Sequence, residues 1–113
     1  MQILFNRILS LLLQGEQIPL RNGNFYSYVG PKSTRVNGAI FPLAFEYEIS
    51  AQNRKKVTIE LIHAMYQLHL QNGRMPSRNE MLQNFLFELN GRPCNYTVAV
   101  YIVQRLLRDD INI

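Results

Sequence analysis

The spacing of apolar residues changes once along this chain of 113 residues, close to Ser50. Over residues 41–49, large apolar and aromatic residues occupy every odd position and Pro42, Ala44, Glu46 and Glu48 lie between them, which is the period-two pattern of a strand that buries one face. Beyond Ser50, apolar residues recur every three or four positions, from Val57 through Leu61 to Leu68, as in an amphipathic helix. Sheet periodicity followed by helix periodicity predicts an α+β fold.

The first part of the chain predicts one helix and a small antiparallel β-meander. Apolar residues at helical spacing precede Gly15, so we expect a helix over residues 2–14. Three turn-forming segments rich in Gly, Asn and Pro follow, and aromatic and β-branched residues lie between them. The turns are expected at residues 21–24, 30–33 and 37–38, and the strands at residues 18–20, 25–29, 34–36 and 40–49. Pro42 has no N–H for a ladder, so an edge or a bulge is expected there.

Three helices are expected after Ser50. The first runs from Gln52 or Lys56 to Gln71 and stops at Asn72-Gly73. For the second helix, Ser77 is a good N-cap, and Glu80, three residues later, completes a capping box. The apolar stripe expected to be buried on this helix consists of Met81, Leu82, Phe85, Leu86 and Leu89, before Asn90-Gly91 ends it.

The third helix is expected to begin at Asn95 as its N-cap. Its inward-facing residues are Val98, Ile102, Leu106 and Leu107. Ile111 and Ile113 alternate at the end of the chain, as in a short terminal strand. The sequence thus divides into residues 1–51, a helix plus a small sheet, and residues 52–113, a helix-turn-helix-like unit of three helices. A chain of this length is expected to form one compact domain.

Composition and charge restrict the class of protein. Hydrophobic residues make up 47% of the chain and charged residues 18%, as in a globular protein. The formal net charge is +4, and residues 52–108 hold eight basic against three acidic residues, which favours a polyanionic partner. The basic run Arg54-Lys55-Lys56 is expected at the start of a helix, as a solvated cluster or a phosphate contact. Apolar runs are too short for a membrane helix, and the single cysteine, Cys94, fits a reducing, cytoplasmic setting.

The outward face of the third expected helix carries a continuous polar stripe. Its members are Thr97, Tyr101, Gln104, Arg105 and Arg108, at i, i+4, i+7, i+8 and i+11. Arg can grip guanine or phosphate, Gln can pair with adenine, and hydroxyl groups can reach phosphate. A helix with this stripe could therefore lie in a major groove of DNA. The preceding helix would brace the backbone through Arg74, Arg78 and the amide groups after Ser77.

Two phrases in this half of the chain resemble winged-helix and LexA-like helix-turn-helix domains. The first, residues 73–81, reads Gly-Arg-Met-Pro-Ser-Arg-Asn-Glu-Met, and the second is Tyr96-Thr97-Val98, which would open the recognition helix. The resemblance covers about half the chain. It implies structural roles for Pro76, Ser77 and Glu80. It also implies that Tyr96, Thr97 and Tyr101 lie near nucleic acid.

No arrangement of residues indicates an enzyme, a cofactor or a small-molecule substrate. His63 and His69 are six positions apart, so they do not share the helix face that a metal pair needs. Cys94 is read as a packed thiol. Glu46 and Glu48 share one strand face and are read as solvent-facing acids. The aromatic residues of the sheet are expected in the core, with a stacking platform for single strands as the alternative: Phe25, Tyr26, Tyr28, Phe41, Phe45 and Tyr47.

The sequence leaves two functions open besides a generic helical bundle. The first is DNA binding through a recognition helix at residues 95–108, as a small regulator or targeting module. The alternative is a protein-interaction module or small subunit that forms a homodimer through its apolar N-terminal helix. The residues that motivate this alternative are Ile3, Leu4, Ile8, Leu11, Leu12 and Leu13.

Overall fold

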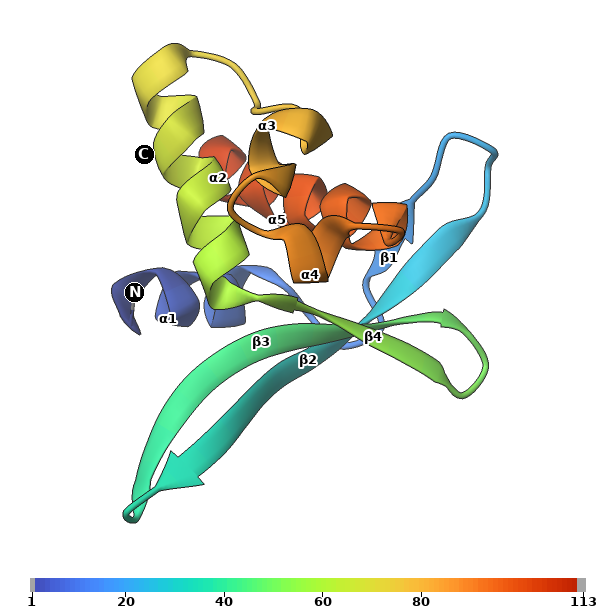
Figure 1. Ribbon diagram of the computed structural model, residues 1–113. Helices are drawn as coiled ribbons and strands as arrows, with labels where there is room; N and C mark the ends of the chain where they lie inside the picture. The colour runs from blue at the N-terminus through green and yellow to red at the C-terminus, as the bar shows by residue number, and fades with distance from the viewer. Residues whose placement is uncertain (1, 112–113) are drawn as a thin grey trace. The chain divides into compact units, whose positions relative to one another are not determined.

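The computed structural model describes the backbone of residues 2–111 (Figure 1), and side chains except at residues 34–36, 40–43 and 109–111. The chain divides into two compact units, Met1–Ile59 and Glu60–Ile113. The first contains a helix and an antiparallel sheet, and the second is built of helices. The α+β fold class is therefore confirmed.

Helix α1 (Gln2–Leu11) packs its apolar face against the sheet of the same unit. It buries Leu4, Phe5 and Ile8, and the Phe5 ring stacks on Phe45 with 5.1 Å between ring centroids. Leu12, just beyond the helix, is also buried. The burial of one such side chain stabilises a fold by about 1.5–3 kcal/mol. The helix therefore has a buried apolar side, whereas Ile3 and Leu9 are exposed.

The sheet has four antiparallel strands in the order β1-β2-β3-β4. They are β1 (Gln17–Pro19), β2 (Phe25–Val36), β3 (Ala39–Ser50) and β4 (Asn53–Thr58). The prediction of a turn at residues 30–33 is wrong, because β2 continues through them. The register shifts between Tyr28 and Gly30. Val29 is therefore the extra residue of a β-bulge, directly before the Gly30-Pro31 pair. Pro31 lies opposite Phe45 in the β2–β3 ladder, and on its other side β1 pairs with β2 only at residues 25–27.

The expectation for Pro42 is confirmed. Lys32 pairs with Ala44 and Ser33 pairs with Pro42, so Leu43 is an extra residue at a bulge in β3. On its other side, β3 pairs with β4 only from Ala44 onwards. Pro42 therefore lies beside a bulge and on an edge, the two places where a strand tolerates the loss of an N–H.

Residues 53–58 form β4, so the prediction that a helix begins at Gln52 or Lys56 is wrong. Arg54 lies opposite Glu48 in the ladder, and Lys56 lies opposite Glu46. The Arg54 Nε to Glu48 Oε1 distance is 3.0 Å. Opposite charges across neighbouring strands stabilise their pairing, and cations on an edge strand discourage pairing with another chain. The basic run belongs to the sheet, and the helix that follows begins at Ile59.

The second unit contains helices α2 (Ile59–Asn72), α3 (Arg78–Leu82), α4 (Leu86–Leu89) and α5 (Pro93–Ile111). As expected, α2 stops before Gly73, whose φ of +74° suits glycine. The second expected helix is not continuous, because residues 83–85 separate α3 from α4. This break turns Leu86 outward, so the prediction that Leu86 is buried is wrong, whereas Met81 and Leu89 are buried.

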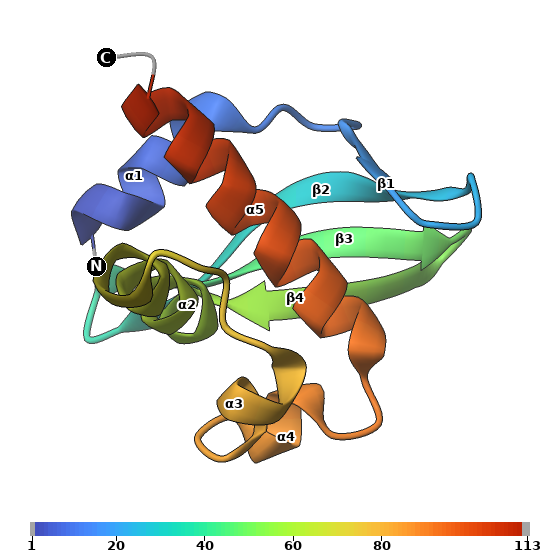
Figure 2. The ribbon, with the colours of Figure 1, turned by 90° about the horizontal axis from the view of Figure 1, so that it is seen from above.

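Helix α5 is a single uninterrupted helix (Figure 2) that begins two residues before the expected cap. Pro93 occupies its first position, where the fixed φ of proline suits a helix and the missing N–H costs nothing. Asn95 is therefore inside the first turn and is not the N-cap. At the other end, Ile111 belongs to α5, which contradicts the expected terminal strand at that position, and Ile113 lies outside the described residues.

Candidate nucleic-acid interface

The predicted polar stripe lies on the solvent side of α5. Thr97, Gln104 and Arg108 are exposed, and Tyr101 and Arg105 are half-buried. The opposite side of the helix is fully packed and consists of Val98, Ala99, Ile102, Val103 and Leu106. Since the buried and exposed sides follow the 3.6-residue period, the stripe is one continuous surface about three turns long. Residues 97–108 contain no Asp or Glu.

The two arginines of the stripe differ in their surroundings. Arg108 is exposed, whereas Arg105 is half-buried and its Nε is enclosed by protein. An enclosed Nε fixes the stem of the side chain and lowers the entropy lost when the terminal nitrogens bind a ligand. Arg108 is followed in the sequence by Asp109 and Asp110.

Arg78, predicted to contact phosphate, is bound inside the second unit. Its Nη2 donates a hydrogen bond of 2.9 Å to the carbonyl oxygen of Leu89. The buried Asn95 side chain donates a second hydrogen bond, of 2.7 Å, to the carbonyl oxygen of Glu88. The two donors bind neighbouring carbonyls at the end of α4, and the Leu89 carbonyl also accepts a hydrogen bond of 3.0 Å from the backbone N–H of Arg92. They hold α4 beside the beginning of α5.

Tyr96, which precedes the stripe, and Thr97, its first member, also form hydrogen bonds within the unit. The Tyr96 hydroxyl donates to the carbonyl oxygen of Pro76 at 2.6 Å, and burial, followed by the nearby negative charge of Glu80, raises the pKa of Tyr96. The Thr97 Oγ1 donates to the carbonyl oxygen of Pro93 at 3.2 Å, one helical turn earlier. Tyr96 thus joins α5 to the segment that precedes α3.

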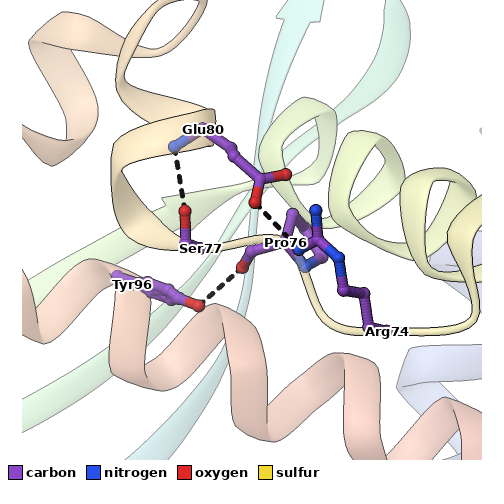
Figure 3. A network of polar contacts seen from close by, with 5 residues as sticks. All are labelled: Arg74, Pro76, Ser77, Glu80 and Tyr96. Atoms are coloured by element: carbon purple, nitrogen blue, oxygen red, sulfur yellow. Dashed lines mark hydrogen bonds and ion pairs between the residues drawn. The ribbon is translucent and has the colours of Figure 1, made fainter.

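The predicted N-cap at Ser77 is confirmed (Figure 3). Its Oγ accepts a hydrogen bond from the backbone N–H of Glu80 at 3.2 Å. Arg74 Nη1 lies 2.8 Å from Glu80 Oε1, and this hydrogen bond, together with those from Ser77, holds the pKa of the Glu80 carboxyl below its ordinary value. Arg74 and Ser77 are therefore engaged at the start of α3, and both remain exposed.

Comparisons with protein-family models, curated proteins and solved structures found no match. No helix among the described residues is long and apolar enough to cross a membrane. Where side chains are described, no three His, Cys, Asp or Glu residues come together as metal ligands.

Sequence reasoning missed Phe87, the most exposed large apolar residue described. Its side chain is 92% exposed on α4, and that of the adjacent Leu86 is 53% exposed. A continuous helix would have placed Leu86 on the buried stripe, so no local signal in the sequence marks this pair. The break at residues 83–85 and the hydrogen bonds to α4 create the exposed pair.

The position of β4 also changes where the charge resides. The first unit holds seven basic and three acidic residues, whereas the second holds five of each. The second unit therefore has no net charge. The net charge of +4 belongs to the unit that contains the sheet.

Proposed function

We propose that this protein binds duplex DNA and that the exposed stripe of α5 lies in the major groove. The observation that carries the proposal is the stripe itself, in which three exposed and two half-buried polar or cationic side chains follow one side of a 19-residue helix without an acid among them. The major groove admits an α-helix and displays the donor and acceptor pattern of each base pair. Gln104 and Arg105 have side chains suited to base edges, and Thr97 and Arg108 suit phosphate.

The neighbouring elements support this role by fixing the start of α5. Hydrogen bonds from Arg78 and Asn95 hold α4, and the hydrogen bond from Tyr96 holds the segment before α3. A recognition helix needs such a rigid base, because loosely held contacts lose affinity to side-chain ordering. In this proposal Arg78 and Tyr96 position the helix, whereas Arg74 and Ser77 flank the DNA backbone.

The proposal is tested by titrating a fluorescent duplex of random sequence with the full chain at several salt concentrations. Arg105→Gln/Arg108→Gln removes two charges without placing an acid near the enclosed Nε. A matched control, Arg21→Gln/Lys56→Gln, removes two exposed charges elsewhere. Each lost phosphate contact lowers the slope of log K against log salt by about 0.9. We expect the slope to fall by about 1–2 only in the α5 variant. Equal slopes for the α5 variant and the control would refute the α5 interface.

A second candidate is self-association through the N-terminal segment, with the protein as a small subunit in a reducing, cytoplasmic setting. The observation in its favour is that Ile3 and Leu13 are 79% and 71% exposed at the two ends of this segment. Leu12 is buried, so substitution there would unfold the unit and report nothing about a dimer. Light scattering of wild type and Ile3→Gln/Leu13→Gln is the direct test. A wild-type monomer at high protein concentration rules the homodimer out.

A further inference from the structure

Four asparagine–glycine pairs lie in the turns of this chain: Asn22-Gly23, Asn37-Gly38, Asn72-Gly73 and Asn90-Gly91. In each pair the glycine has a positive φ, which suits a residue without a Cβ. The missing Cβ also leaves the glycine nitrogen open to the asparagine side chain. Once deprotonated, this nitrogen can attack the side-chain amide carbon and close a cyclic imide, the first step of deamidation. All four pairs are exposed, so access of water does not distinguish them.

At two of the pairs the glycine N–H is held by a hydrogen bond. Gly23 donates to the carbonyl oxygen of Leu20 at 3.2 Å, and Gly73 donates to the carbonyl oxygen of His69 at 2.9 Å. Removing the proton from such a nitrogen breaks the hydrogen bond and leaves an amide anion facing the partial negative charge of a carbonyl oxygen. The fold therefore opposes imide formation at both of these pairs.

The Asn90-Gly91 pair, between α4 and α5, has the opposite geometry. Asn90 has φ −68° and ψ 120°, and Gly91 has φ 68°. Across them the backbone N–H of Arg92 donates to the carbonyl oxygen of Leu89 at 3.0 Å. This is a type II turn, in which the N–H between the two central residues takes no part in the closing hydrogen bond. Among the described residues, neither the Gly91 N–H nor the Asn90 side chain has a hydrogen-bond partner.

The charge near this turn also favours loss of the amide proton. Arg92 follows the pair directly and is exposed, and residues 89–108 contain no Asp or Glu. A cation stabilises a nearby amide anion and the oxyanion that forms when this anion attacks a carbonyl group. By contrast, Arg74, which follows the Asn72-Gly73 pair, lies 2.8 Å from the Glu80 carboxylate, so that its charge is partly neutralised.

We propose that Asn90 is a deamidation site of the folded protein. Hydroxide takes the proton from the Gly91 nitrogen, this nitrogen forms a bond to Cγ of Asn90, and the Cγ–Nδ2 bond breaks. Nδ2 leaves as ammonia with a proton from water. Water then opens the imide at either carbonyl, which gives aspartate or isoaspartate. Either product adds one negative charge to the second unit, and isoaspartate also adds a methylene to the backbone of the turn between α4 and α5.

The test is peptide mapping of the full chain after incubation in mildly alkaline buffer. Liquid chromatography with mass spectrometry measures the aspartate and isoaspartate formed at each asparagine over time. A parallel sample unfolded in guanidinium gives the intrinsic rates, which should be similar because each pair has the same two residues. Folding should slow Asn22 and Asn72 by roughly tenfold, the factor that one net hydrogen bond gives. Asn90 should react fastest of these three in the folded chain, at a rate that rises in proportion to hydroxide concentration.

Two variants establish the assignment. Asn90→Gln keeps a neutral amide but cannot close the same ring, so the peptide that contains position 90 should gain no acid. Asn72→Gln is the matched control, in which Asn90 should react at the wild-type rate, and circular dichroism establishes that both variants are folded. The proposal is overturned if Asn22 or Asn72 reacts as fast as Asn90 in the folded chain, or if Asn90 yields no isoaspartate. These measurements involve no DNA, so their outcome is independent of the proposed function.

Discussion

Tyr96 separates a structural role from a DNA-contacting role more sharply than any other residue of the predicted site. Its hydroxyl was expected near nucleic acid, but it donates a 2.6 Å hydrogen bond to the carbonyl oxygen of Pro76. Tyr96→Phe removes this hydroxyl and keeps the ring. A protein hydrogen bond contributes about 0.5–1.5 kcal/mol net, and a buried group left without its partner costs about 1–3 kcal/mol. Because Pro76 is buried, we expect the variant to lose about 1–2 kcal/mol of unfolding free energy.

The assay is thermal unfolding followed by circular dichroism, with duplex binding measured well below the unfolding temperature. Each kcal/mol lost lowers Tm by about 4–8 °C in a domain of about 100 residues, so the expected decrease is at least about 4 °C. The folded-state pKa of Tyr96 is raised, so the stability it contributes is complete below the unfolded pKa, near 10, and is lost as pH rises through the folded pKa. The gap between wild type and variant should therefore narrow above pH about 10. An unchanged Tm together with weakened DNA binding would refute the structural role and show that the hydroxyl contacts the ligand.

Two further substitutions test the packing of each unit. In the first unit, the buried Tyr28 hydroxyl has no hydrogen-bond partner among the described residues, so Tyr28→Phe should raise the unfolding free energy by about 1 kcal/mol in urea titrations. Burial, with a smaller effect of Glu16, raises the pKa of Tyr28 from 10.0 to about 12, so wild type should lose stability as pH rises across that interval whereas the variant should not. In the second unit, Asn95→Ala removes the donor to Glu88 and should cost about 1–3 kcal/mol in the same titration, with unchanged stability contradicting the bracing of α4.

The elements predicted correctly are those whose signal is local. The alternation over residues 40–49 became β3, and the spacing from Leu61 to Leu68 became α2. Ser77 and Glu80 formed the expected cap because a capping box is complete within four residues. The exposed stripe of α5 followed from helical periodicity in the same way. In each case one short segment contains both partners of the interaction that defines the structure.

The errors occurred where the deciding partner is distant in the sequence. From the sequence, Arg54 and Lys56 were expected at the start of a helix. In the structure they lie opposite Glu48 and Glu46 in the β3–β4 ladder. The interruption at residues 83–85 is stabilised by donors that lie outside α4: Arg78 is eleven residues from Leu89, and Asn95 is seven from Glu88. Likewise, the Tyr96 hydroxyl binds a carbonyl twenty residues away. No pattern in the sequence around Tyr96 indicates this hydrogen bond.

Because Arg54, Lys55 and Lys56 lie in β4, the net positive charge and the proposed recognition helix belong to different units of the chain. The sequence predicted that the excess of positive charge lies in the same half as the recognition helix. The same half would then have provided both affinity for DNA and specificity for base sequence. Because β4 belongs to the first unit, the second unit has no net charge and the first unit has the net charge of +4. Long-range attraction to a polyanion would therefore come from the first unit. Contacts by α5 then act at short range, where base edges are discriminated. If the α5 interface holds, Gln104→Ala should mainly speed dissociation from a preferred sequence, with little change in the association rate.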